Sequence, residues 1–570
     1  MNSVFGTWTS RLKKRSLLLV LSMLLPTFGI SNTVIAADKI YASYSILEIP
    51  IPVISLEKFT KTGKLDQDLA VYQDYISPQQ LQKFREILLR SIKVNPAIAT
   101  QFLSTEQGEF LLHRLATLID YKFYDRELAI NYLRHAFIAA SQTKEGITIL
   151  NLIRNYPSNN VHFNLKNILE IGEELESIIS ETNQAITIVQ QLSKQEAASY
   201  TTVSLLSSSS INKPVNLETK KYTVNFFDHQ RNRSLPTDIY LPHVQYPTPI
   251  IIISHGLGLN SSNFDYLAQT FASQGLTVVI PNHPRLVINN ITDVKLKEAQ
   301  EFIERPLDIK YILNELDKYN QYNPNFQDKL NLNRVGVIGQ SFGGYTALAL
   351  AGAKINFQQL EIDCHPENLI NTWNMSLLFQ CRALELSPKS TRENHPYLSV
   401  NLADERVKAA IAINPITSSI FGKSGLNQIK TPVMFISSSK DTVAPALYEQ
   451  IIPFSWLNNP QKYLVMLVGG THFSTIGNSK PGSQQISLPT DMVGNAAQAR
   501  NYINALSLPF FQTYVSQKLE YMSYLNAGYA ETIADPSLGL SFLQSLKSPA
   551  LEPILNNERK KNSISPILNY

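Results

Sequence analysis

Residues 334–350 read Arg-Val-Gly-Val-Ile-Gly-Gln-Ser-Phe-Gly-Gly-Tyr-Thr-Ala-Leu-Ala-Leu, and this stretch decides the fold. It begins as an apolar, strand-like run and ends as a helix-forming run. Between the two stands Gly339-Gln340-Ser341-Phe342-Gly343. A strand, a Gly-x-Ser-x-Gly turn and a helix in succession are typical of a nucleophile elbow, a sharp turn that lifts the serine out at the end of the strand. We therefore predict Ser341 as a nucleophile, flanked by Gly339 and Gly343 because side chains there would collide.

The same rhythm of strands and helices extends on both sides of this turn. Helical patterns cover about 262–274 and 293–319, and continuous apolar runs such as 250–253 suit strands buried on both faces of a mainly parallel sheet. Strands that alternate with helices imply right-handed crossovers and a three-layer α/β domain with helices on both faces. The predicted strands are Tyr222–Phe227, Thr237–Leu241, Pro249–Ser254, Leu276–Pro281, Arg334–Gly339, Val407–Asn414, Val433–Ser437 and Tyr463–Val468.

A serine hydroxyl needs a base to remove its proton, and the base needs a carboxylate to orient it. The chain order expected after an elbow of this kind is Ser, acid, His. His472 directly follows the last predicted strand and is the predicted base. Asp441 follows the strand at 433–437 and is the predicted acid, whereas Asp404, the weaker competitor, precedes a strand. The other histidines beyond the elbow, His365 and His395, lie in residues 353–400, which interrupt the sheet and are predicted to form a cap.

Acyl transfer through a serine develops negative charge on the carbonyl oxygen, which needs fixed hydrogen-bond donors. The backbone N–H of Phe342, directly after the nucleophile, is one predicted donor. The second is expected from His255-Gly256-Leu257-Gly258, which ends another apolar strand, with the N–H of Leu257 as the donor. Gly256 and Gly258 let this backbone approach a substrate closely.

Composition divides the rest of the chain. The first part reads as mainly helical, with one short strand near 46–53 and a helix start marked by Ser77 and Pro78. A polar stretch with four consecutive serines suits a linker. The predicted segments are a helical domain at 38–196, a linker at 197–218, an α/β domain at 219–516 with the cap at 353–400, and a C-terminal helical extension and tail at 517–570.

Residues 1–36 have the layout of a secretory signal peptide. Arg11, Lys13, Lys14 and Arg15 precede a mainly apolar run of nine residues at 17–25, and Val34-Ile35-Ala36 ends the segment with small residues at the cleavage positions. We predict export to the periplasm or the cell exterior, with an uncleaved membrane anchor as the alternative. These four cations are the only charged side chains in the segment, so the net charge of +4 falls to 4 − 4 = 0 without it. A neutral chain has no basic footprint for nucleic acid, and no stable membrane span is expected after cleavage.

The chain has two cysteines, Cys364 and Cys381. An exported protein meets an oxidising compartment, so a disulfide is the favoured interpretation and two free buried thiols are the alternative. Their spacing, with only His365 nearby, makes a poor zinc site. We expect neither a metal nor a cofactor.

His-Gly-Leu-Gly at 255–258 together with Gly-Gln-Ser-Phe-Gly-Gly at 339–344 resembles the platelet-activating-factor acetylhydrolase and dienelactone-hydrolase-like branch of the α/β-hydrolases. The resemblance covers about 220–515 and implies hydrolysis of short or modest acyl esters, lipid esters included, without a cofactor. The acetylhydrolases carry their acid on the strand after the nucleophile's helix, where this chain has Asn414, which cannot serve as a carboxylate. Residues 37–41 and 77–81 resemble an uncharacterised helical domain that precedes such hydrolases in cyanobacteria, which favours an exported bacterial protein.

The leading hypothesis is therefore a carboxylic-ester hydrolase acting on a small-molecule or lipid ester. Apolar side chains around 373–379 either line an acyl pocket or pack the cap on the core. An acyltransferase, a thioesterase or a peptide hydrolase would use the same three residues. A scaffold protein that works through 38–196 is a hypothesis of a different class, and the intact order of Ser, Asp and His argues against it.

Overall fold

The computed structural model describes residues 37–561, apart from 45–46, 72, 74–76, 95, 105, 121–124, 201–215, 285–290, 371, 388–400 and 478–492. The chain divides into two compact units between Glu181 and Thr182. The predicted signal peptide lies outside the described residues, as does most of the predicted linker. Within the described part of the chain, no helix combines the length and the apolar character needed to cross a membrane.

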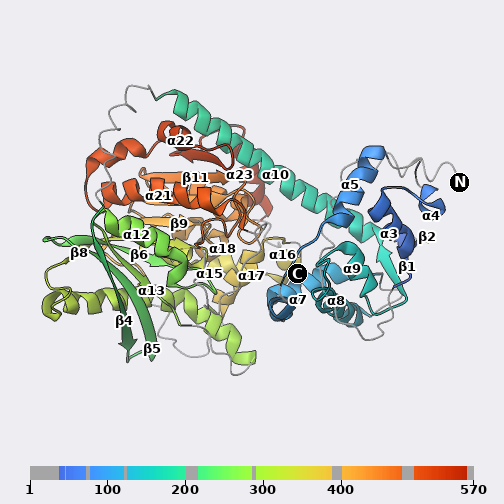
Figure 1. The fold of residues 1–570 in the computed structure, drawn as a ribbon, viewed down its shortest axis with the longest axis horizontal. Helices are drawn as coiled ribbons and strands as arrows, with labels where there is room; N and C mark the ends of the chain where they lie inside the picture. Colours follow the sequence, from blue (N-terminus) through green and yellow to red (C-terminus); the bar gives the residue numbers. More distant parts are fainter. Residues whose placement is uncertain are drawn as a thin grey trace, which may run out of the picture. The chain divides into compact units, whose positions relative to one another are not determined.

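The N-terminal unit contains helices and a small sheet (Figure 1). β1 (Lys39–Tyr44) pairs antiparallel with β2 (Leu47–Pro52) and parallel with β3 (Asn160–Asn164). The helices agree with the predicted mainly helical character of this part, but the sequence predicts only the strand near 46–53. The pairing of β1 with β3 joins segments that lie far apart in the chain, which a local pattern does not encode. The helices are α3 (Val53–Thr62), α4 (Gln67–Ala70), α5 (Pro78–Leu89), α6 (Pro96–Leu103), α7 (Glu106–Ala116), α8 (Arg126–Ala140) and α9 (Ile149–Arg154).

The long helix α10 (Leu165–Ala198) begins in the first unit and ends in the second. Beyond Thr182, its apolar positions recur at helical spacing and are buried in the core of the second unit, at Ala185, Ile186, Ile188 and Val189. Ser193 on the same helix accepts a hydrogen bond from the backbone N–H of Phe542 at 2.9 Å. The boundary between the units therefore falls inside α10 and not in the predicted linker at 197–218, because the apolar face of the helix continues past the first unit.

A mixed sheet forms the centre of the second unit (Figure 1). Its strand order is β12-β11-β10-β9-β8-β6-β7-β5-β4 among the described residues. The strands from β7 to β11 in this order pair in parallel, while β4, β5 and β12 pair antiparallel with their neighbours. The strands are β4 (Thr219–Asp228), β5 (Arg233–Pro242), β6 (Thr248–Ser254), β7 (Thr277–Pro281), β8 (Leu330–Gln340), β9 (Val407–Ile413), β10 (Val433–Ser438), β11 (Lys462–Val468) and β12 (Gly539–Leu543).

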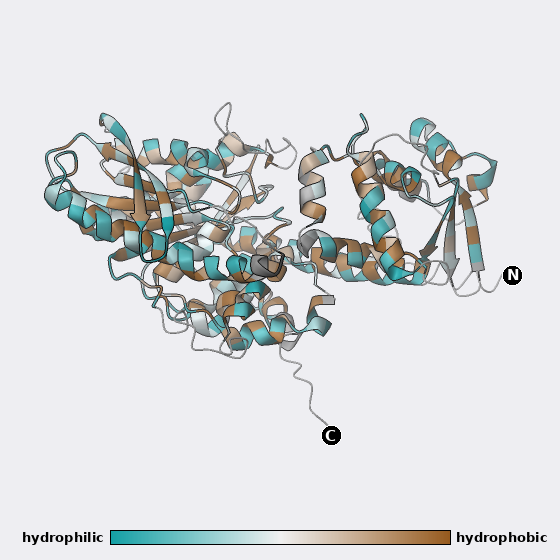
Figure 2. Cartoon of the chain, turned by 90° about the horizontal axis from the view of Figure 1, so that it is seen from below, coloured by the Kyte–Doolittle hydropathy of each residue, from teal (hydrophilic) through white to brown (hydrophobic). Residues whose placement is uncertain are grey.

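Alternate residues of the central strands enter cores on opposite faces of this sheet, as the period of two in a strand requires. In β6, Ile251 and Ile253 pack with α12 (Asp265–Ser273) and α21 (Ala496–Tyr514). Ile250 and Ile252 pack on the other face, with α13 (Ile291–Tyr322) and α14 (Phe342–Leu350). Figure 2 shows the matching bands of hydrophobic and hydrophilic residues along the helices. The expected three-layer α/β architecture, that of the α/β-hydrolase fold, is confirmed.

Between α14 and β9 the chain forms short helices in the region predicted as the cap. The remaining helices of this unit surround the sheet or follow its last parallel strand. They are η3 (Ser261–Phe264), α15 (Phe357–Asp363), α16 (Pro366–Ile370), α17 (Met375–Gln380), η4 (Cys381–Leu386), α18 (Ser418–Leu426), η6 (Leu447–Ile451), α19 (Ile452–Trp456), η7 (Leu519–Tyr524), α22 (Ala527–Ile533) and α23 (Glu552–Lys561).

The C-terminal segment contains helices, as predicted, and also a strand that the sequence analysis did not predict. Residues 539–543 form β12, which pairs antiparallel with β11 and extends the main sheet. The apolar run is short, and the unpaired edge of β11 offers hydrogen-bond partners that a short helix would not use. The described residues from 517 onward are therefore part of the α/β unit.

Candidate active site

The elbow places Ser341 between the end of β8 and the first residue of α14. Its φ of 57° and ψ of −119° are strained for a residue with a side chain. A Cβ atom on Gly339 would lie 2.0 Å from the carbonyl oxygen of Gly343, and one on Gly343 would lie 1.9 Å from that of Ser254. Both glycines are therefore required by the close approach of backbone. Ser341 itself is partly exposed.

His472 and Asp441 are brought together by two neighbouring loops, after β11 and β10. The Nδ1 atom of His472 lies 2.6 Å from Oδ2 of Asp441, and the side chains are 4% and 0% exposed. The other carboxylate oxygen of Asp441 accepts the backbone N–H groups of Val443 at 2.8 Å and Ala444 at 2.7 Å. The carboxylate thus has fixed partners on both oxygens, and it orients the imidazole with Nε2 directed away from it.

Two buried amides connect the His472 loop to the elbow. Nε2 of Gln340, the residue before the nucleophile, donates to the carbonyl oxygen of His472 at 3.0 Å. Nδ2 of Asn414 donates to the same oxygen at 3.3 Å and to Ser438 Oγ at 3.1 Å. These contacts join the loop of the predicted base to Gln340, the residue before the predicted nucleophile, and to the end of β9. Asn414 thus binds the loop of His472, the predicted base. It stands at the position where the acetylhydrolases carry their acid. The only sequence signal for these roles is a polar residue at the end of each of two apolar strands.

The loop predicted to supply the second oxyanion donor also lies against the elbow. A Cβ atom on Gly256 would lie 2.5 Å from Gln340 Oε1 and 3.4 Å from Ser341 Cβ. Gly258 has a φ of +72°, a conformation that glycine adopts without strain. Leu257 between them is 46% exposed. Phe342 is buried at the first position of α14, where backbone N–H groups have no acceptor within the helix.

The alternatives considered for the acid and the base are located elsewhere. Asp404 forms a bidentate ion pair with Arg406, at 2.8 and 2.6 Å. Although burial opposes ionisation, the hydrogen bonds and charge of Arg406 hold the pKa of Asp404 below its usual value. His365 has a side chain that is 57% exposed and lies near Glu367. His395 lies outside the described residues.

A second arrangement of serine, histidine and aspartate, which the sequence analysis did not identify, lies under the His255–Gly258 loop. Ser254 Oγ is 3.3 Å from Nε2 of His283, and Nδ1 of His283 is 3.0 Å from Oδ2 of Asp308. Burial, and then the charge of Arg305, lower the pKa of His283 well below its usual value. His283 is therefore neutral, donates from Nδ1 to Asp308, and accepts from the serine hydroxyl.

Arginines surround this second arrangement. Arg231 and Arg233 both bind Asp308, at 2.9 Å and at 2.7–2.8 Å. Arg305 lies on the same helix as Asp308 and donates to the carbonyl oxygen of His255 at 2.8 Å. The loop beside the nucleophile thus rests on a buried network of charges.

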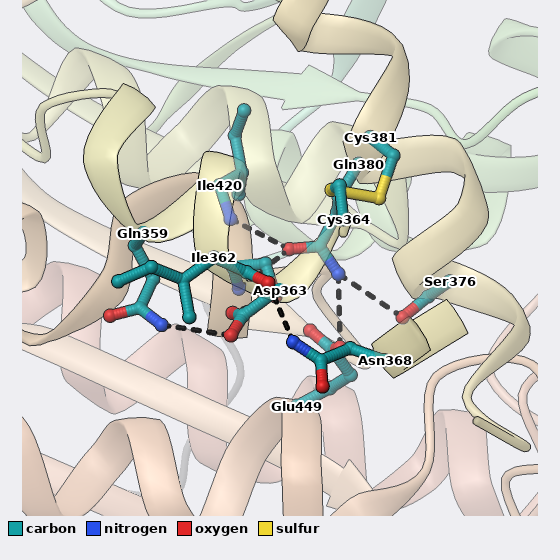
Figure 3. Close-up of a disulfide and its surroundings, with 11 residues drawn as sticks. Gln359, Ile362, Asp363, Cys364, Asn368, Ser376, Gln380, Cys381, Ile420 and Glu449 are labelled. Atoms are coloured by element: carbon teal, nitrogen blue, oxygen red, sulfur yellow. Dashed lines mark hydrogen bonds between the residues drawn. A yellow bond between two sulfur atoms is a disulfide. The ribbon is translucent and has the colours of Figure 1, made fainter. Parts of the chain in front are cut away.

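A disulfide joins Cys364 to Cys381 within the cap, as Figure 3 shows. Next to it, Gln380 accepts the backbone N–H groups of Ser419 and Ile420 at the start of α18, at 3.0 and 2.9 Å. Gln380 also donates to the fully buried Glu449 at 2.9 Å. The disulfide therefore closes the cap on itself, and buried polar contacts fix the cap to the α/β core.

Metal-binding geometry is not a feature of the described residues. Within them, no group of three or more His, Cys, Asp or Glu side chains could hold a metal ion.

Comparison with known families gives two matches. Residues 36–164 match the family described as an alpha/beta hydrolase of unknown function (DUF1400), and residues 207–365 match the chlorophyllase family. The first match falls on the N-terminal helical unit, and the second spans the elbow but ends before Asp441 and His472. A search of curated proteins finds no match. With the fold, these two matches support assignment of the chain to the α/β-hydrolase superfamily; neither match is to the acetylhydrolases or dienelactone hydrolases.

Proposed function

We propose that this chain is a serine hydrolase that cleaves carboxylic esters through an acyl-enzyme. The observation that carries the proposal is the strained, partly exposed Ser341, whose neighbour Gln340 binds the loop of a histidine that has its Nδ1 2.6 Å from a buried carboxylate. A buried carboxylate in this position keeps Nε2 of the histidine free to act as a base and stabilises the imidazolium. The chlorophyllase match over 207–365 supports a hydrolase in the same region.

In the proposed reaction, Nε2 of His472 removes the hydroxyl proton of Ser341 as Oγ attacks the ester carbonyl carbon. The carbonyl oxygen becomes an oxyanion, for which the backbone N–H groups of Phe342 and Leu257 are the proposed donors. His472 then gives its proton to the departing alcohol, and the acyl group remains on Ser341. A water molecule, deprotonated by His472, repeats the sequence and releases the acid.

The surroundings of the nucleophile favour an apolar acyl group. Leu257, an exposed aliphatic side chain, lies in the loop whose preceding residue, Gly256, approaches the Cβ of Ser341. An apolar acyl chain that covers Leu257 would remove this surface from water, which stabilises binding by about 25 cal/mol per Å². Esters of modest or lipid-like acyl groups are therefore the proposed substrates.

The disulfide between Cys364 and Cys381 supports a further part of the proposal, that the protein acts outside the cytosol. Disulfides persist in oxidising compartments and are rare where thiols are kept reduced. This agrees with the prediction of a signal peptide at residues 1–36. The test is the molecular mass of the protein recovered from the exported fraction, which should lack those residues; a full-length protein retained in the cytosol would contradict export.

The activity test is hydrolysis of p-nitrophenyl esters with two to sixteen carbons by the mature chain and by Ser341→Ala. Release of free acid in buffer without an acceptor is expected, which an obligatory acyltransferase would not give. Thioesters and peptides of the same acyl groups serve as competing substrates. Undiminished activity in Ser341→Ala would contradict the proposal.

A further inference from the structure

One buried side chain, that of Arg305, contacts both segments that carry the proposed oxyanion donors. Arg305 of α13 donates from a guanidinium nitrogen to the carbonyl oxygen of His255 at 2.8 Å. The carbon of the same guanidinium lies 4.6 Å from the centre of the Phe342 ring. His255 begins the loop that carries Leu257 N–H, and Phe342 carries the other N–H. Arg305 therefore contacts both segments of the proposed oxyanion hole.

The first contact fixes the peptide between His255 and Gly256, and a hydrogen bond within the loop fixes the next peptide, which carries the N–H of Leu257. The carbonyl of His255 is bound by Arg305, and the carbonyl of Gly256 lies 2.8 Å from Nδ1 of its neighbour His255. Nε2 of His255 accepts the backbone N–H of His283 at 3.3 Å, so Nδ1 carries the proton and donates to Gly256. In a trans peptide the N–H points opposite to the C=O. With the Gly256 carbonyl turned toward His255, the N–H of Leu257 is turned away from it.

The second contact fixes the start of α14. The Phe342 ring stacks under Arg305 and packs against Phe302 and Phe379, each with a centroid 4.9 Å away. A cation over an aromatic face is attracted by the ring quadrupole, and more strongly when both are desolvated. Phe342 is the first residue of α14. A side-chain ring held in place therefore also restrains the backbone at the start of this helix.

Arg305 is itself held rigidly. Its Nε lies 3.4 Å from Glu301 Oε2, one helical turn earlier, and Glu301 also binds Arg233 at 2.9 Å. The next residue, Pro306, has no N–H to offer the carbonyl of Phe302, and the hydroxyl of Tyr345 donates to that carbonyl at 2.7 Å. Tyr345 lies on α14, so this bond ties the two helices together beside Arg305.

We propose that Arg305 is a positioning residue of the oxyanion hole, which aligns the N–H groups of Leu257 and Phe342 by binding the His255 carbonyl and stacking on the Phe342 ring. The inference rests on the proposed function. It assigns a role in the reaction to a buried cation that touches no reacting atom.

The test uses the full mature chain with Arg305→Met and Arg305→Lys. The readout is the second-order rate at which a fluorophosphonate labels Ser341, followed by intact mass, because its phosphoryl oxygen needs the same donors as an ester and no knowledge of the natural substrate is required. Loss of one oxyanion donor costs about 10²–10³-fold in rate. We expect Arg305→Met to slow labelling by about 10²-fold and Arg305→Lys by about 10-fold, since an ammonium can bind the carbonyl but lacks the planar guanidinium that stacks on the ring.

The matched control is Arg406→Met, which removes a partly buried arginine of the same unit that also contacts α13, through Asn314 at 2.9 Å. We expect its labelling rate to stay within about threefold of wild type. With the best ester of the p-nitrophenyl series, Arg305→Met should lower kcat, calculated for the folded fraction, with little change in KM, because an interaction made only in the transition state is lost.

Wild-type labelling rates in folded Arg305→Met would overturn the inference while leaving the proposed function intact. If Arg305→Met does not fold, Arg305→Lys decides: an unchanged rate overturns the inference, and a slowed rate with unchanged KM supports it. Failure of the wild-type chain to be labelled at Ser341 would overturn the proposed function instead, and this inference with it.

Discussion

The proposed site of Ser341, His472 and Asp441 can be compared with the hydrogen-bonded Ser254, His283 and Asp308, which are also described in the second unit and differ from it in access and charge. In both, Nδ1 of a histidine faces a buried carboxylate: His472 with Asp441, and His283 with Asp308. Ser341 is partly exposed on a strained turn, whereas Ser254 is completely buried within β6. Serine, histidine and aspartate in hydrogen-bonding order therefore do not by themselves define a reactive site. A site also needs a nucleophile lifted out of the strand and a histidine able to take a proton.

The charged groups around His283 also affect whether it can take a proton. Burial and the neighbouring arginines, Arg305 first, lower the pKa of His283 well below its usual value, so it does not accept a proton near neutral pH. Its partner Asp308 is already shared with Arg231 and Arg233. The second arrangement therefore serves as a structural hydrogen-bond chain beneath the loop that carries Leu257.

The largest expected difference between the two arrangements is in the serines. Ser341→Ala should lower kcat by about 10⁶-fold, because removal of a triad serine abolishes the covalent route. Ser254→Ala should lower kcat by less than about tenfold, since it removes one hydrogen bond under the loop. Steady-state kinetics with the best p-nitrophenyl ester checks both variants, and equal losses would break the distinction.

The aspartates should separate activity from stability. Asp441→Asn keeps acceptors for Val443 and Ala444 but favours the wrong histidine tautomer, so kcat should fall by about 10⁴-fold with little loss of stability. Asp308→Asn leaves Arg231 and Arg233 without their shared charge and should lower the free energy of unfolding by about 3–5 kcal/mol. Urea denaturation together with kcat of the folded fraction checks this; a stable Asp308→Asn with the larger loss of kcat would reverse the two roles.

A smaller loss of stability is expected from a change in the cap that alters neither arrangement of serine, histidine and aspartate. Replacement of Cys364 and Cys381 by alanine removes a disulfide between residues separated by 17 positions, which should lower the free energy of unfolding by about 3 kcal/mol. The measurement is urea denaturation of the double variant beside wild type, both without reductant. Equal stabilities would show that Glu449 and Gln380 alone hold the cap.

The smallest effect is a pH dependence of stability from His283. A histidine whose folded pKa is lowered binds fewer protons when folded than when unfolded, so the free energy of unfolding is undiminished above about pH 6.5 and decreases as the pH falls below it. One such group gives at most about 1.4 kcal/mol per pH unit. His283→Gln should show a shallower decrease between pH 6.5 and 5 than wild type in urea denaturation. The exposed His365→Gln is the control and should keep the wild-type slope; a wild-type slope in His283→Gln would contradict the account.

The fold of the second unit and the residues of the candidate site could be predicted from local sequence patterns. The elbow, the apolar strands and the polar residues that follow them are encoded within a few positions, and the loops of Asp441 and His472 are adjacent because β10 and β11 are neighbours in the sheet. The supporting contacts were not predictable. Arg305 meets His255 and Gln340 meets His472 across 50 and 132 positions, and β12 and the end of α10 join the α/β unit through packing that no local pattern specifies.

The most direct test of the central claim is to locate the label after fluorophosphonate treatment of the folded wild-type chain, by peptide mass mapping. The account predicts one modified serine, Ser341, and no modification of Ser254, with labelling lost in Ser341→Ala. Modification of Ser254, or of the Ser341→Ala variant at the wild-type rate, would contradict it.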